Sequence, residues 1–184
     1  MNETLEQKVK RVTAEVVEVV GYNPEWPLWF EQEKVHLLHC LPHGLILRIE
    51  HFGSTAVPGL HAKPIVDMAI EISNEVWGKE VIPQTLEPQG YDCFWRPLGD
   101  KDEPPYFTWC IKRDAAGERT HHLHFVKAGF KDQELRFRDI LRDNTEITRQ
   151  YGELKLRLSR QFREDRIGYT NAKGNFILNV LEQN

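Results

Sequence analysis

A Gly-Ser turn and a lone aspartate are the most chemically suggestive part of the chain, within residues 49–72, IEHFGSTAVPGLHAKPIVDMAIEI. Gly53 has no Cβ, so the backbone can approach a ligand closely there. Ser54 and Thr55 can cap a short helix whose free N–H groups would face an anion. Asp67 ends the next apolar run, where its carboxylate could hold Mg²⁺ against a phosphate. The pattern predicts a phosphate-handling site, although it also suits an ordinary turn and a solvated carboxylate.

Two strands must position these residues. The apolar run over 45–52 predicts a strand that stops at Gly53, and the run over 65–72 predicts a second strand. Alternation in the second strand places Val66, Met68, Ile70 and Ile72 on a core face and Asp67, Ala69 and Glu71 on the opposite face. If the two strands are neighbours, we expect Asp67 to lie near the Gly-Ser turn.

A pair of histidines offers further ligands. A hairpin with strands over 105–112 and 119–127 is predicted, and alternation points His122 and His124 to the same side. If this strand lies beside the one carrying Asp67, the Asp/His/His set would favour Zn²⁺, Mn²⁺ or Fe²⁺ over Mg²⁺, because imidazole suits softer ions. Strand histidines are also common as plain polar surface residues, and both interpretations stay open.

Basic residues and one tyrosine could complete a phosphate site. Lys63 precedes the second strand, Arg119 opens the histidine strand, and Lys173 follows Tyr169 near the C-terminus. Arginine can bind a phosphate in bidentate fashion, whereas lysine acts as a point charge. Taken singly, each is more typical of a solvated surface.

The string EHFGSTAVPGLHAKPIVDM, residues 50–68, resembles the signature of the GrpB family, which belongs to the nucleotidyltransferase superfamily. The resemblance continues through NPEW at 23–26, THHLH at 120–124 and DRIGYTNAK at 165–173. It implies an α+β fold of nucleotidyltransferase type, a mixed sheet with packed helices and a cleft beside the Gly-Ser turn. It implies no known reaction, and a related domain is fused to some dephospho-CoA kinases as an accessory.

One departure from the superfamily pattern bears on catalysis. Active nucleotidyltransferases pair two carboxylates, as Asp-x-Asp or Asp-x-Glu, to bridge two Mg²⁺ ions, whereas the second position here is Ala69. Glu50 or Glu71 could supply a replacement, but Glu50 shares its strand face with Arg48, so an ion pair competes with a ligand role. Asp67 and Glu50 are therefore the candidate catalytic residues, and whether the protein is an enzyme stays open.

Length and composition fit one domain. The chain has 184 residues, of which 40% are hydrophobic, and we predict a single domain over 1–184 with 1–14 as an N-terminal extension. Apolar spacing near 3.6 after residue 129 predicts a helical C-terminal third. Cys40, Cys93 and Cys110 lack a CxxC pair, so we expect buried thiols rather than disulfides.

Charge and hydropathy narrow the partners. The net charge is −4, and the basic residues of the C-terminal third are mixed with acidic ones, so strong nonspecific nucleic-acid binding is not expected. No apolar run reaches the length of a membrane helix, and the N-terminus lacks the apolar core of a signal peptide. A cytoplasmic location without a membrane partner is the expectation.

The sequence thus predicts a domain that binds a nucleotide or another phosphorylated small molecule, with a divalent metal such as Mg²⁺, Mn²⁺ or Zn²⁺. In an enzyme, Gly53 and Ser54 would cradle phosphate, Asp67 with His122 or His124 would hold the metal, and lysines would neutralise charge during nucleotidyl or phosphoryl transfer. The alternative is a non-catalytic accessory module that binds a metabolite or a partner protein. A hydrolase built on the histidines ranks last, because no general base pairs with a nucleophile.

Overall fold

A computed structural model describes residues 16–97 and 103–184, so the predicted extension over 1–14 lies outside the described residues. Five strands form one sheet in the order β1-β2-β5-β4-β3. They are β1 (Ile46–Phe52), β2 (Val66–Ile72), β3 (Asp92–Pro97), β4 (Tyr106–Arg113) and β5 (Arg119–Val126). β2 and β5 run parallel and the other neighbours antiparallel. The predicted mixed sheet is confirmed.

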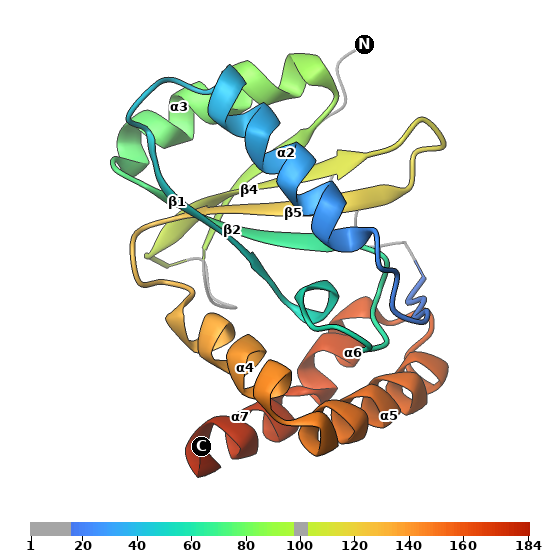
Figure 1. The fold of residues 1–184 in the computed structure, drawn as a ribbon. Helices are drawn as coiled ribbons and strands as arrows, with labels where there is room; N and C mark the ends of the chain where they lie inside the picture. Colours follow the sequence, from blue (N-terminus) through green and yellow to red (C-terminus); the bar gives the residue numbers. More distant parts are fainter. Residues whose placement is uncertain (1–15, 98–102) are drawn as a thin grey trace.

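Two helices cover one face of this sheet, α2 (Trp26–Cys40) and α3 (Glu75–Leu86) (Figure 1). Their buried side chains form one core with the inward residues of β2 and β5, including Met68, Ile70, Leu123 and Phe125. The predicted alternation in β2 is confirmed, because Val66, Met68, Ile70 and Ile72 are each no more than 5% exposed. The face with Asp67 therefore points away from this core.

The C-terminal third is helical, as predicted, and consists of α4 (Asp132–Asp143), α5 (Thr145–Gln161), α6 (Arg166–Ala172) and α7 (Gly174–Gln183). Figure 1 shows these helices together at the opposite end of the molecule from α3. Their apolar stripes pack on Val57 and Leu60, in the loop between β1 and β2. This loop, which includes the Gly-Ser turn, is thus held between the sheet and the C-terminal helices. Among the described residues, no helix is long and apolar enough to cross a membrane.

The cysteine prediction is wrong for two of the three residues. Cys93 on β3 and Cys110 on β4 form a disulfide, because the antiparallel register places them directly opposite each other. Their spacing in the sequence carries no sign of this pairing, which depends on the register of the two strands. Cys40 keeps a free thiol at the end of α2, and burial raises its pKa.

Candidate functional site

The sheet brings the Gly-Ser turn against Asp67. β1 ends at Phe52, whose register partner on β2 is Asp67, and the next residue, Gly53, has a φ of +70°. A Cβ on Gly53 would lie 2.6 Å from Asp67 Oδ2. Glycine is therefore required here both by its backbone conformation and by the close approach of the carboxylate.

The turn itself differs from the expected capped helix. It is a single 3₁₀ turn, Ser54–Ala56, with no side-chain cap, so the capping expected of Ser54 and Thr55 is wrong. Thr55 is 1% exposed, and its hydroxyl donates to the Ile65 carbonyl at 3.3 Å and lies 3.0 Å from His51 Nε2. The Thr55 side chain is committed to the interior, which leaves Gly53 and Ser54 as the turn residues nearest a ligand.

Asp67 and two histidines meet on neighbouring strands. β5 lies beside β2 with His122 in register with Asp67, as the metal hypothesis required. Asp67 Oδ1 is 3.1 Å from His122 Nδ1 and 4.0 Å from His124 Nε2. One ligand atom from each residue lies within 4.8 Å of the others. The Asp67 side chain is 28% exposed and those of the histidines 11% and 17%, so the cluster is accessible mainly at the carboxylate.

Burial and hydrogen bonding set the protonation of this cluster. Burial lowers the pKa of His122 and holds the pKa of His124 well below its usual range. Burial raises the pKa of the Asp67 carboxyl, but the hydrogen bond from His122 and the nearby positive charges outweigh it and bring the pKa to about 2. At neutral pH the set is a carboxylate with two neutral imidazoles, the state in which these groups ligate metals.

The two histidines are not equivalent. Asp67 accepts a hydrogen bond from His122 Nδ1, and His122 Nε2 lies 3.3 Å from Arg119 Nη1, which can only donate. Both nitrogens of His122 are therefore engaged, and metal ligation would require its proton to move and Arg119 to turn away. Within the described part of the chain, His124 Nδ1 has no hydrogen-bond partner, and Nε2 is beyond hydrogen-bond distance of Asp67. His124 is the better metal ligand.

Aromatic rings enclose the imidazoles. Phe107 stacks on His124 with the ring centroids 5.7 Å apart, and Phe52 meets His124 edge-on at 5.2 Å. Trp109 meets His122 edge-on at 5.2 Å. These contacts exclude water from the rings and account for the burial that keeps them neutral. The alternation of side chains along β4 could have predicted this aromatic enclosure, because it places Phe107 and Trp109 on the same face as the histidines.

The predicted phosphate ligands Lys63 and Lys173 come together at Tyr169. Tyr169 is 1% exposed, and the two Nζ atoms lie 5.5 and 4.5 Å from its ring centroid. Burial lowers the pKa of Lys63 to about 7 and that of Lys173 to about 8. Neither Lys63 nor Lys173 is therefore the solvated surface residue that its sequence context alone would suggest.

Lys155 adds a third amine, to which the sequence pattern had not pointed. It is 2% exposed on α5, donates to the His61 carbonyl, and places Nζ 4.7 Å from the Tyr151 ring centroid. Burial, followed by the charges of Lys173 and Lys63, lowers its pKa well below the usual value. The sequence feature that could have identified Lys155 is its position four residues after Tyr151, on the apolar stripe of α5. We call Lys63, Lys155 and Lys173 the lysine cluster.

The lysine cluster has no carboxylate counter-charge among the residues that the structure describes. Within residues 16–97 and 103–184, no carboxylate lies within 4.0 Å of its ammonium groups. Asp67 is the acidic group whose charge raises the pKa of Lys63 and Lys173. Burying positive charge without a partner is costly and lowers the pKa of each amine, and a bound anion would stabilise the charged form again. A recess of about 270 Å³ is lined by Lys63 together with Arg119, Arg166, Glu18 and Glu118.

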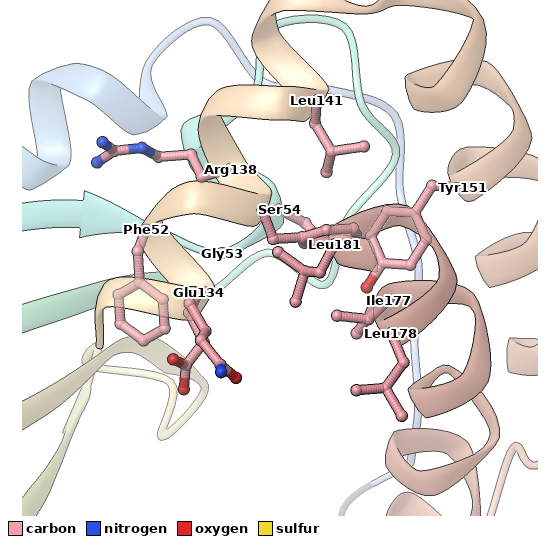
Figure 2. Close-up of a pocket in the computed structure, with 12 residues that line it drawn as sticks. Phe52, Gly53, Ser54, Glu134, Arg138, Leu141, Tyr151, Ile177, Leu178 and Leu181 are labelled. Carbon is pink, nitrogen blue, oxygen red and sulfur yellow. The ribbon is translucent and has the colours of Figure 1, made fainter. Parts of the chain in front are cut away.

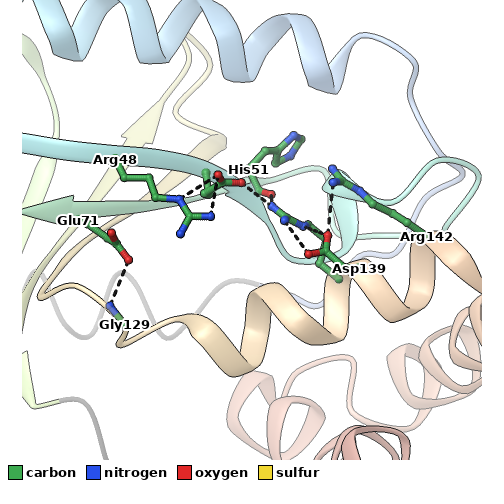
Figure 3. A network of polar contacts seen from close by, with 8 residues as sticks. Arg48, His51, Glu71, Gly129, Asp139 and Arg142 are labelled. Atoms are coloured by element: carbon green, nitrogen blue, oxygen red, sulfur yellow. Dashed lines mark hydrogen bonds and ion pairs between the residues drawn. The ribbon is translucent and has the colours of Figure 1, made fainter. Parts of the chain in front are cut away.

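Glu50 is held by two arginines. Its Oε2 accepts from Arg138 Nη1 at 2.9 Å, and its Oε1 lies 3.0 Å from Arg48 Nη2, in the polar network of Figure 3. Glu71, the other possible replacement carboxylate, accepts from the backbone N–H of Gly129 at 3.1 Å (Figure 3). The geometry matches the ion-pair interpretation of Glu50, and no second carboxylate joins Asp67 in the described cluster.

An apolar groove of about 290 Å³ opens beside the Gly-Ser turn (Figure 2). We call it the C-terminal groove, because its walls come largely from α4 and α7, with Tyr151 of α5. Its apolar lining includes Phe52, Phe137, Tyr151, Ile177, Leu178 and Leu181. Tyr151, Ile177 and Leu181 lie on the apolar stripes of α5 and α7, and they border an open cavity next to the polar site.

Comparison with known proteins supports the resemblance seen in the sequence. The family model described as GrpB protein matches residues 16–183. UPF0157 protein PA4798 of Pseudomonas aeruginosa is 36% identical over 167 residues, covering 90% of this chain and 66% of that protein. UPF0157 protein YqkA of Bacillus subtilis is 32% identical over 171 residues, covering 90% of this chain and 46% of that protein. The chain thus spans less than two thirds of the length of these two relatives.

A solved structure shows the same architecture. The crystal structure of conserved protein GrpB from Enterococcus faecalis superposes with a TM-score of 0.75 at 30% sequence identity. The match covers 90% of this chain and 96% of that one. The sheet and the helices packed on it are therefore shared over nearly the whole described length.

Proposed function

The chain belongs to the GrpB family, and on that premise we propose that it binds a phosphorylated small molecule, with a nucleotide as the first candidate. The ligand would lie where Gly53, Asp67 and the lysine cluster meet. One observation carries the proposal: among the described residues, the buried Lys155 and the half-buried Lys63 and Lys173 have no carboxylate partner, and they lie near an ionised aspartate and an imidazole with an unpartnered nitrogen. Such an arrangement is incomplete without an anion.

The proposal includes a divalent metal, because Asp67 would otherwise repel the phosphate. Asp67 and His124 would hold the ion, and phosphate oxygens would complete its coordination. A carboxylate with an imidazole favours Mn²⁺ or Zn²⁺ over Mg²⁺. His122 acts as a positioning residue, since it donates to Asp67 and faces Arg119.

In the enzymatic form of the proposal, the bound metal would stabilise charge on a phosphoryl or nucleotidyl group during transfer. Lys63 and Lys173 would neutralise the phosphate oxygens, and the aromatic rings around His124 would exclude water. The Gly53 and Ser54 backbone would allow the phosphate to approach closely.

The second candidate is a non-catalytic module that binds the same class of ligand, or a partner protein, without turnover. Ala69 and the arginine-paired Glu50 favour it, because together they leave Asp67 as a single carboxylate. Two-metal transfer chemistry normally needs a second bridging carboxylate. The two candidates share the binding site and differ only in turnover.

Thermal shift in the presence of nucleotides, CoA precursors and inorganic pyrophosphate, each with Mn²⁺, Zn²⁺ or Mg²⁺, tests the proposal. A ligand at about 100 times its Kd should stabilise the protein by about 2.7 kcal/mol. We expect a metal-dependent shift that is lost in Asp67→Asn and His124→Ala and kept in His39→Ala, a control on the exposed end of α2. No shift with any phosphorylated probe, or an equal shift in Asp67→Asn, would overturn the proposal.

A turnover assay then separates the two candidates. Product phosphates can be followed by ³¹P NMR with the ligand that gives the largest shift. Turnover that Asp67→Asn abolishes supports the transferase, whereas tight binding without turnover supports the accessory module.

A further inference from the structure

The C-terminal groove is continuous with the polar site through three shared residues. Phe52, Gly53 and Tyr151 line the groove. The Phe52 ring also meets His124 edge-on, and the Tyr151 ring lies 4.7 Å from Lys155 Nζ. Gly53 is the residue against which Asp67 packs. The C-terminal groove therefore adjoins the lysine cluster and Asp67.

Away from this junction the groove is open and largely apolar, and its polar lining comes from Gln133, Glu134 and Arg138 on α4. Figure 2 shows Phe52 on one side of the cavity and Ile177 and Leu178 on the other, with Glu134 near Phe52. Leu178 is 55% exposed although it lines the cavity. Exposed apolar side chains that gather in a concave site are typical of a surface that binds a ligand.

We propose that the C-terminal groove binds the apolar part of the ligand whose phosphate lies at the lysine cluster. This inference rests on the proposed function. It narrows the substrate class to phosphate esters of an apolar group, because charge complementarity orients the phosphate toward Gly53 and Tyr151 and the apolar end toward Leu178. A free phosphate or a sugar phosphate would leave the groove unfilled.

A series of n-alkyl phosphates tests the inference by calorimetry in the presence of Mn²⁺. Affinity should rise about fourfold for each added methylene until the groove is filled. Methyl phosphate should bind weakly, hexyl phosphate tightly, and hexanol not measurably, because the alcohol lacks the anionic group that the lysine cluster binds.

Matched variants locate the two ends of the ligand. Leu178→Ser should lower the ratio of hexyl to methyl phosphate affinity several-fold. Leu28→Ser, at an equally exposed leucine on α2 (55%), should leave that ratio unchanged. Lys173→Met should weaken every phosphate in the series by the same factor, since it acts on the shared group.

The outcomes distinguish this inference from the function on which it rests. Alkyl phosphates that bind without dependence on chain length would overturn the inference and leave the proposed function standing. Failure of every alkyl phosphate to bind would overturn the inference, and failure of the nucleotides and pyrophosphate as well would overturn both. Hexanol binding as tightly as hexyl phosphate would overturn the inference, as would a concentration-dependent self-association that Leu178→Ser removes, because the groove would then be an interface between copies.

Discussion

Two buried charged clusters of this molecule differ in whether the protein completes them. Glu33 on α2 is 2% exposed, and its carboxylate accepts from the Tyr91 hydroxyl at 2.6 Å and forms an ion pair with Lys112. In the lysine cluster Lys155 is buried and Lys63 and Lys173 are half-buried, yet no carboxylate in the described residues pairs with them. We call the first cluster the Glu33 network. The difference teaches that unpaired buried charge, rather than buried charge alone, marks the candidate site.

Removal of the Glu33 carboxylate should give the largest effect. Glu33→Ala leaves the buried Tyr91 hydroxyl and the partly exposed Lys112 ammonium without their partner, and should lower the free energy of unfolding by about 2–3 kcal/mol. Urea denaturation measures this loss. The matched control is Glu31→Ala, whose carboxylate is 57% exposed and pairs with Lys34 at 3.5 Å, and should cost less than about 1 kcal/mol. Equal losses in both variants would contradict the contrast.

Substitution of Gly53 should come next. Gly53→Ala combines a positive φ with a Cβ that would lie 2.6 Å from Asp67 Oδ2. Gly117→Ala has a similar φ of +85° with open space around it, so its cost should be the backbone strain alone, about 1–2 kcal/mol. Gly53→Ala should cost more and should also reduce metal-dependent ligand stabilisation, because Asp67 must move. Thermal unfolding of both variants with and without ligand checks this, and equal behaviour would count against the close approach.

In contrast to Glu33→Ala, removal of the Lys155 amine should affect ligand affinity more than stability. Lys155→Met removes an amine that has no carboxylate partner among the described residues but donates to the His61 carbonyl, so the free energy of unfolding should fall by only about 1 kcal/mol, the net contribution of that hydrogen bond. Affinity for pyrophosphate, measured by calorimetry, should fall about tenfold or more because a charged hydrogen-bonding group is lost. A large loss of stability with unchanged affinity would place Lys155 in a structural role.

The pH dependence of stability should show the smallest effect. The pKa of Lys63 falls to about 7 in the folded protein, against about 10.4 for an unperturbed lysine. Between these values the unfolded state binds more protons, so stability should rise with pH. Melting temperatures from pH 7 to 10 should rise less steeply in Lys63→Met than in the parent protein or in Lys34→Met. An identical slope in all three would contradict the buried position of Lys63.

Strand periodicity made part of the site predictable. A period of two assigned Asp67, His122 and His124 to their faces, and the glycine before Ser54 pointed to a close approach. The pairing of β2 with β5 depends on a parallel contact between segments more than 50 residues apart, which alternation alone does not determine. The sequence therefore left this pairing as a condition of the metal hypothesis.

Other parts of the site needed the folded chain. Lys155 and Tyr151 share the buried stripe of α5, and the sequence does not distinguish a core position from one that faces a buried cavity. Thr55 was expected at the phosphate, but its hydroxyl is bonded to the backbone of Ile65. The Cys93–Cys110 pair depends on the β3–β4 register. Each of these features is set by contacts between distant segments.

Calorimetric titration of inorganic pyrophosphate with Mn²⁺ tests the central claim most directly. It should compare the parent protein with Lys63→Met/Lys173→Met and with Lys34→Met/Lys79→Met, a control that removes two lysines outside the cluster. We predict binding in the parent and in the control, and at least a hundredfold loss in the cluster variant, about 2.7 kcal/mol. Equal affinity in all three proteins, or no binding in the parent, would contradict a phosphate site at the lysine cluster.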